Sequence, residues 1–175
     1  TWLAATASAY GVDSGDLDKL LSRVDAVPVS VALAQAALES GWGTSRLAKE
    51  GNALFGQLGD SSGPVIVAQG IGYRTFDSLL DGVRSSARPL TTNYAARRFR
   101  AARAALRHAA GEGHSLNGLK LLGGLTLYSE RGRDYLADVR NLIHVNKLQQ
   151  FDASRLVGTT PLDARADSAR DPNDA

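Results

Sequence analysis

The segment that most constrains the fold is PVSVALAQAALE, residues 28–39. Drawn as a helix, it is apolar around nearly its whole circumference, which is typical of a helix buried at the centre of a domain. Pro28 is tolerated in the first turn of such a helix, and the helix must end near Ser40-Gly41. The sequence therefore predicts a domain with this helix in its interior.

Only three residues after Val29 in this segment are polar, namely Ser30, Gln35 and Glu39. Gln35 and Glu39 lie four positions apart and so share one face of the helix. Burial and the negative end of the helix dipole both disfavour the charged carboxylate and raise the pKa of Glu39. A carboxyl that keeps its proton near neutral pH is what a glycosidase needs to protonate a leaving oxygen. The alternative is a structural ion pair between Glu39 and an arginine across the core.

The rest of the chain is predicted to be mostly helical. Apolar periodicity and capping residues predict helices at residues 2–10, 16–24, 28–39, 45–51, 79–87, 93–110, 116–127 and 134–148. Ser45 and Asp77 are the expected N-caps of two of them. Residues 59–72 hold Gly, Ser and Pro around three β-branched residues, which predicts a loop followed by a small hairpin. We therefore expect a domain at residues 1–157 and a flexible tail or linker at residues 158–175, where apolar periodicity is absent.

Composition limits the classes of function. The 175 residues are 43% hydrophobic and 22% charged, as in one globular domain, and no apolar run approaches the roughly 18 residues of a membrane-spanning helix. The absence of cysteine excludes thiolate metal sites, and the three histidines lack metal-ligand spacing, so we expect no metal site. The net charge of +2 suits an anionic polymer, but no basic–aromatic motif supports nucleic acid. Five arginines form either a solvated helix face or a polymer-binding patch; they are Arg97, Arg98, Arg100, Arg103 and Arg107.

Trp42 follows the predicted acid closely and lies between Gly41 and Gly43. The glycines leave room for a ligand to approach the backbone, and indole faces commonly receive the apolar faces of sugars. Taken alone, a tryptophan more often fills a core. Both interpretations stay open on these residues.

Four segments together resemble a known family. They are VPVSVALAQAALESGWGTSRLAKEGNALFGQ (27–57), YRTFDS (73–78), TTNYAARR (91–98) and LTLYSERGRDYLADVRNLIHVN (125–146). The chain closely resembles bacterial N-acetylglucosaminidases of glycoside hydrolase family 73, and within them most closely the Bax-like branch. The likeness covers roughly residues 10–148.

The resemblance implies an α+β, mainly α fold, with a lysozyme-like helical lobe and a small β-hairpin lobe flanking a substrate groove. It implies an endo-β-N-acetylglucosaminidase that cleaves peptidoglycan between N-acetylglucosamine and N-acetylmuramic acid, without metal or cofactor. Glu39 matches the catalytic acid, Tyr128 a groove-lining tyrosine, and Asn52 and Phe55 the groove floor. Gln35, Trp42 and Tyr73 are the further expected substrate contacts. We expect a monomer in the bacterial cell envelope, either periplasmic or secreted, although no leader is visible in this chain.

The chain departs from the family pattern at the second acid, which relatives often carry on the hairpin. Residues 65–73 contain no acid, and Asp60 and Asp77 are the nearest carboxylates. Asp77 is better explained as a helix cap, whereas Asp60 lies in a Gly/Ser loop that can swing over a groove. Two mechanisms are therefore open. In the first, Asp60 or a polar group such as Gln69 positions a water molecule. In the second, the 2-acetamido oxygen of the substrate attacks C1. The missing hairpin acid favours the second mechanism.

Two rival functions remain at this level. A lytic transglycosylase uses a similar fold and one glutamate, but it leaves a 1,6-anhydro product. A non-catalytic wall-binding module is the other alternative. Retention of Glu39, Trp42 and Tyr128 together argues for an active enzyme.

Overall fold

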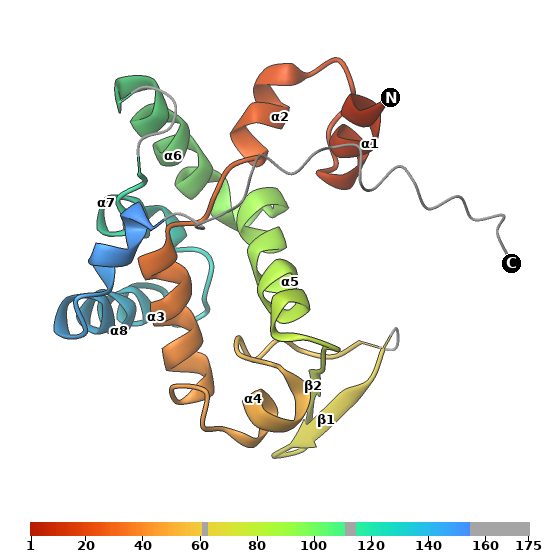
Figure 1. Ribbon diagram of the computed structural model, residues 1–175, viewed down its shortest axis with the longest axis vertical. Helices are drawn as coiled ribbons and strands as arrows, with labels where there is room; N and C mark the ends of the chain where they lie inside the picture. Colours follow the sequence, from red (N-terminus) through yellow and green to blue (C-terminus); the bar gives the residue numbers. More distant parts are fainter. Residues whose placement is uncertain (61–62, 111–114, 155–175) are drawn as a thin grey trace, which may run out of the picture.

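The computed structural model describes residues 1–60, 63–110 and 115–154 (Figure 1). The helices are α1 (Trp2–Ala9), α2 (Leu17–Arg23), α3 (Val29–Ser40), α4 (Arg46–Gly51), α5 (Leu79–Thr92), α6 (Arg97–Ala110), α7 (Gly118–Leu122) and α8 (Gly132–Val145). Three 3-10 turns are η1 (Tyr94–Ala96), η2 (Gly123–Leu125) and η3 (Leu148–Ala153), and the two strands are β1 (Val65–Ala68) and β2 (Ile71–Arg74). The predicted mainly α fold with one small hairpin is confirmed. The predicted tail at residues 158–175 lies outside the described residues.

Helix α3 is the centre of the larger core. It packs against α7, α8 and η3, and the buried side chains around it include Phe99, Leu122 and Val139. The expectation of burial on all sides is wrong, because Val29 and Leu33 are exposed on the side that α7, α8 and η3 do not cover. An apolar composition shows that a helix is suited to burial, but the neighbours decide which face is covered.

The start of α3 is tied to η3 by one carboxylate. Asp152 accepts hydrogen bonds from the Ser30 backbone nitrogen (2.8 Å), the Ser30 hydroxyl (3.0 Å) and the Gly118 nitrogen (2.8 Å). A Cβ added at Gly118 would lie 2.2 Å from the Ser30 oxygen, so only glycine allows this approach. These contacts hold η3 and α7 against the first turn of α3.

The hairpin forms the second, smaller lobe beside α4, as Figure 1 shows at the lower right. Its strands pair antiparallel, from Val65 opposite Arg74 to Ala68 opposite Ile71. Gln69 and Gly70 make the turn, with φ angles of 52° and 78°. Two positive φ angles in a two-residue turn match the right-handed twist of a hairpin, and the presence of glycine lowers the cost. The predicted hairpin is confirmed.

Helix α5 begins at Leu79, as predicted, but it has a different N-cap and runs further than we predicted. Its N-cap is Ser78, whose hydroxyl accepts a hydrogen bond from the Asp81 nitrogen (3.2 Å), and not Asp77, which is exposed. A cap must be the last residue before the helix for its side chain to reach the free N–H groups. The helix continues past the predicted end at residue 87 to Thr92, because Leu90 and Thr91 are buried against the body of the domain.

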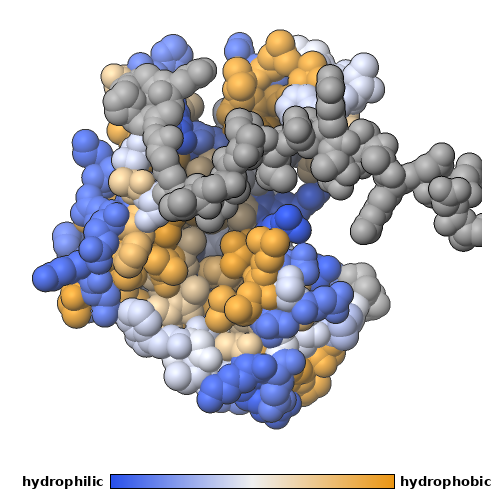
Figure 2. Space-filling model, viewed as in Figure 1, coloured by the Kyte–Doolittle hydropathy of each residue, from blue (hydrophilic) through white to orange (hydrophobic). Residues whose placement is uncertain are grey.

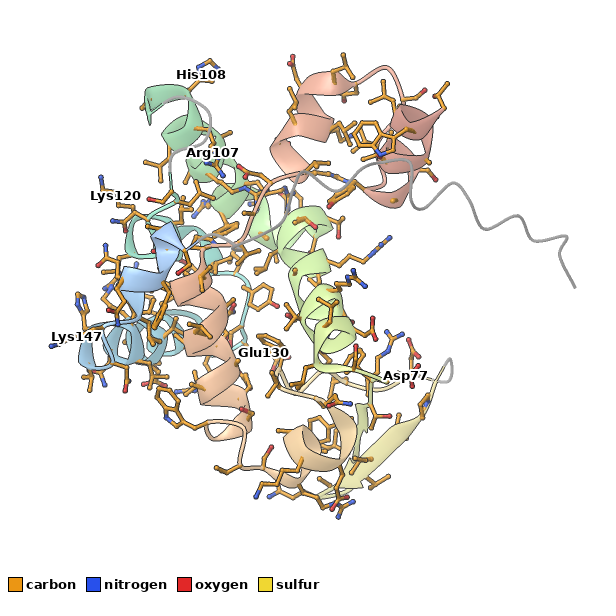
Figure 3. All side chains as sticks on the ribbon, in the orientation of Figure 1. Asp77, Arg107, His108, Lys120, Glu130 and Lys147 are labelled. Atoms are coloured by element: carbon orange, nitrogen blue, oxygen red, sulfur yellow. The ribbon has the colours of Figure 1, made fainter. Side chains whose placement is uncertain are left out.

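Two of the five arginines of α6, Arg100 and Arg103, are buried, so both interpretations as a surface feature are wrong for these two, whereas Arg98 is exposed. Arg103 is 1% exposed and donates to the carbonyl oxygens of Asp25 and Ala26, each at 2.9 Å. Arg100 is also buried and donates to the Asn93 carbonyl (2.8 Å). Figure 3 places Arg107 on α6, where it pairs with the Asp25 carboxylate at 2.8 Å.

Helices α1 and α2 form a small unit with its own core of Ala7, Val12 and Leu20, packed by Tyr10. Arg103 also donates to the Ser22 carbonyl (2.9 Å), so α6 is hydrogen-bonded to the last turn of α2. Nothing in the described ranges is a helix long and apolar enough to cross a membrane. The buried guanidinium group of Arg103 joins the α1–α2 unit to the main body.

Candidate active site

The end of α3 places Glu39 next to a tight turn. The helix ends at Ser40, and Gly41, Trp42 and Gly43 follow with φ angles of 56°, 59° and 74°. The Ser40 hydroxyl accepts a hydrogen bond from the Gly43 nitrogen (2.7 Å) and so closes the turn. Trp42 is 58% exposed, which excludes the core-filling interpretation. The turn thus presents an acid and an indole to solvent within four residues.

Glu39 retains its proton more readily than an ordinary glutamate. Its residue surface is exposed, yet partial burial of the carboxyl raises its pKa, and this outweighs the lowering by Arg131 and Tyr135. None of the ion pairs found among the described residues includes Glu39, and Arg131 is paired with Asp138 at 2.5 Å. The structure does not support the alternative in which Glu39 forms an ion pair in the core. The raised pKa has the sign that a proton donor requires.

Two tyrosines lie beside this carboxyl. Tyr135, on the first turn of α8, lowers the pKa of Glu39, and Tyr128 is close enough for the Glu39 charge to raise its own pKa. Burial, with a smaller effect of the Glu39 charge, raises the pKa of both phenols. The two side chains consequently remain neutral hydroxyl groups through the ordinary pH range.

The side chain of Gln35 is hydrogen-bonded to Tyr135 and does not reach the surface. Its side chain is 4% exposed, and its Nε2 donates to the Tyr135 hydroxyl oxygen at 3.0 Å. This burial is contrary to our expectation of direct contact with substrate. The sequence analysis did not identify Tyr135. The available signal was a phenol on the apolar face of an amphipathic helix, because a buried tyrosine hydroxyl usually requires a hydrogen-bond partner.

The segment after α4 returns to Glu39. A Cβ added at Gly56 would lie 3.6 Å from Glu39 Oε2, and the Gly56 φ angle of 58° favours glycine there. Asn52 caps α4 in the left-handed conformation, and its Nδ2 donates to the Phe76 carbonyl at 2.9 Å. Asn52 therefore fixes the segment that passes Glu39, and Phe55 is half-buried within it.

The expected residues of the hairpin lobe have different environments. Tyr73 is half-buried on β2, where it pairs with Ile66 and forms a bridge to Leu58. Asp60 is exposed on the loop before β1, directly before two residues that are not described. Figure 3 shows Asp77 at the N-terminal end of α5, away from α3. The groups that the structure gathers around Glu39 are thus Gly56, Tyr128, Arg131 and Tyr135.

The described residues contain no cluster of three or more His, Cys, Asp or Glu side chains that could hold a metal ion. A hollow of about 1530 Å³ lies elsewhere among these residues, between α2, α6 and the start of α3. In the space-filling view, apolar side chains occupy the centre of the face that contains α3 and α5 (Figure 2). The chemistry available at Glu39 is that of a proton-retaining carboxyl beside neutral phenols.

The arrangement of a helical lobe and a hairpin lobe recurs in solved structures. The catalytic domain of the autolysin Auto from Listeria monocytogenes superposes with a TM-score of 0.52 at 21% identity, over 86% of this chain and 88% of that one. The glycoside hydrolase domain of Salmonella typhimurium FlgJ gives 0.50 at 24% identity, over 85% and 88%. The fold is that of a lysozyme-like glycoside hydrolase domain.

Sequence comparison identifies the family within this class. Residues 16–148 match the glucosaminidase family, described as mannosyl-glycoprotein endo-beta-N-acetylglucosaminidase, and the chain belongs to that family. Protein bax of Escherichia coli (strain K12) is 39% identical over 118 residues, which are 66% of this chain. The match spans only 42% of the length of that relative. Helix α1 precedes the matched residues, whereas α2 lies within them.

Proposed function

We propose that the chain is a peptidoglycan hydrolase that cleaves between N-acetylglucosamine and N-acetylmuramic acid, with Glu39 as general acid. Membership of the glucosaminidase family supports a bond beside N-acetylglucosamine. The likeness to a protein described as an autolysin supports the cell wall as substrate. The proposal depends above all on one observation, a solvent-accessible glutamate whose pKa is raised by its surroundings.

In the proposed reaction, Glu39 gives its proton to the glycosidic oxygen as the bond from that oxygen to C1 breaks. The 2-acetamido oxygen of the same sugar attacks C1 and forms a cyclic intermediate. A water molecule then opens this intermediate, gives a proton to the Glu39 carboxylate and leaves a reducing-end N-acetylglucosamine. Substrate assistance of this kind needs no second enzyme carboxylate. It suits a hairpin without acids, whereas the alternative uses Asp60, which is exposed on the adjacent loop.

The exposed indole of Trp42 provides an apolar surface within three residues of the acid. We assign to it the stacking of a sugar ring next to the scissile bond, and we keep Phe55, Tyr73 and Tyr128 as further candidate contacts. An enzyme with this substrate acts in the bacterial cell envelope. We therefore propose a periplasmic or secreted location for the protein that contains this chain.

Digestion of purified peptidoglycan, followed by mass spectrometry of the fragments, tests this function. We expect reducing-end N-acetylglucosamine, unchanged by chelators and absent with Glu39→Gln. Products ending in 1,6-anhydromuramic acid would instead identify a lytic transglycosylase. Binding without cleavage by the folded protein would identify a wall-binding module.

A further inference from the structure

We propose that Gln35 and Tyr135 are positioning residues for Glu39: Gln35 fixes the direction of the Tyr135 hydroxyl, which holds the Glu39 carboxyl in its reactive orientation. This inference rests on the proposed role of Glu39 as general acid. It assigns a function to two side chains that do not need to contact the substrate. Tyr135 comes from α8 and Gln35 from α3, so the pair also joins the two helices that carry the site.

The direction of the hydroxyl follows from its hydrogen bond with Gln35. A phenol has one hydrogen to donate and an oxygen that accepts. Gln35 Nε2 donates to that oxygen at 3.0 Å, so the hydroxyl hydrogen is free to point to a different acceptor. We assign the Glu39 carboxyl as that acceptor, because Gln35 and Glu39 lie one turn apart on the same face of α3 and Tyr135 lowers the pKa of Glu39. Both Gln35 and Tyr135 are 4% exposed, and water therefore does not compete for either group.

Glu39 needs such a support because of its place in the fold. It is the next-to-last residue of α3, at a helix end that opens into the Gly41–Gly43 turn. A glutamate side chain there has several rotamers, and small misplacements of a reacting group are costly in rate. The other groups that influence its charge are Arg131, at the start of α8, and Tyr128, after η2. Of these, Arg131 is more exposed and already paired with Asp138, which leaves Tyr135 as the buried and directed partner.

The pH dependence of turnover tests this role. A general acid works in its protonated form, so activity falls as pH rises through the pKa of Glu39. Because the Tyr135 hydroxyl lowers that pKa, Tyr135→Phe should shift the alkaline limb of the pH–kcat profile to higher pH. It should also reduce kcat about tenfold or more through loss of orientation, with KM nearly unchanged. Tyr128→Phe is the matched control: it removes a nearby phenol that is not among the groups lowering the Glu39 pKa, and the limb should stay in place.

A double-mutant cycle then tests the role of Gln35. Gln35→Met removes the amide donor while keeping a side chain of similar length, so the hydroxyl loses its fixed direction. We expect a shift of the limb in the same direction as for Tyr135→Phe, and no further shift in the double variant, because Gln35 acts through the hydroxyl. Thermal unfolding of each variant shows that the protein measured is folded.

The outcomes separate this inference from the proposed function. If the wild type releases reducing-end N-acetylglucosamine but Tyr135→Phe leaves the limb and kcat unchanged, the positioning role is wrong and the function stands. Additive shifts in the cycle would show that Gln35 acts independently and would overturn the pairing. If folded Glu39→Gln keeps wild-type activity, the proposed function itself fails.

Discussion

Replacing Glu39 with Gln changes one proton and little else, and it gives the sharpest prediction for this protein. The amide keeps the shape and hydrogen-bonding capacity of the side chain but cannot protonate a leaving oxygen. General acid catalysis contributes about 10²–10⁴-fold, which corresponds to roughly 3–5.5 kcal/mol of activation free energy. We therefore expect kcat on peptidoglycan to fall by at least about 10²-fold.

The structure also fixes the effect on stability and its sign with pH. Because the folded-state pKa of Glu39 is raised, ionisation of this group costs stability once the pH exceeds the pKa in the unfolded chain. Glu39→Gln should match the wild type in acid, where both side chains are neutral, and become the more stable protein as pH rises above the unfolded pKa, with its full advantage reached above the folded pKa. Arg131 is exposed and paired with Asp138, so losing the Glu39 charge should cost no more than about 1 kcal/mol.

Steady-state release of fragments and thermal unfolding across pH measure these two effects on the same samples. Glu50→Gln is the matched control, since Glu50 is an exposed partner of Arg46 at 3.2 Å. That change should leave turnover unaltered and stability within about 0.5 kcal/mol. A loss of about 3–5 kcal/mol in Glu39→Gln, with activity lost only through unfolding, would mean a buried ion pair and refute the reasoning.

Three further predictions concern the surroundings of the site. Trp42→Ala should change stability by no more than about 0.5 kcal/mol, because the indole is mostly exposed, yet raise KM for glycan; a large fall in melting temperature would contradict this. Arg103→Met should cost about 3–5 kcal/mol in denaturant unfolding, because it leaves Asp25 and several carbonyl groups without their buried partner; an unchanged midpoint would be the contrary result. Asp60→Asn should reduce turnover only mildly under substrate assistance, whereas a loss as large as that of Glu39→Gln would assign the second carboxylate to Asp60.

Local features of the fold were predictable because their causes lie within a few residues. Ser45 caps α4 through the Ala48 nitrogen at 3.2 Å, as its position before a short segment that closes at Gly51 indicated. The Gln69-Gly70 turn and the helix end at Gly41 follow from the positive φ angles that glycine-containing turns adopt. The predicted N-cap of α5 was wrong. Asp77 and Ser78 are both residue types that suit an N-cap, and the one that caps α5 is Ser78, which directly precedes the helix.

The sequence by itself determined the helix that carries Glu39, the end of that helix at Gly41 and the family to which the chain is similar, since these depend on neighbouring residues and motif spacing. Only the tertiary structure decided how the polar groups are satisfied. Gln35 and Tyr135 are 100 residues apart, and Arg103 reaches carbonyl groups 77 to 81 positions earlier in the chain. The residues around a polar side chain do not indicate a partner at such a distance in the sequence. Burial of the side chain is tolerable only when the fold brings that partner to it. The buried arginines of α6 and the Gln35–Tyr135 pair beside Glu39 were therefore decided by packing.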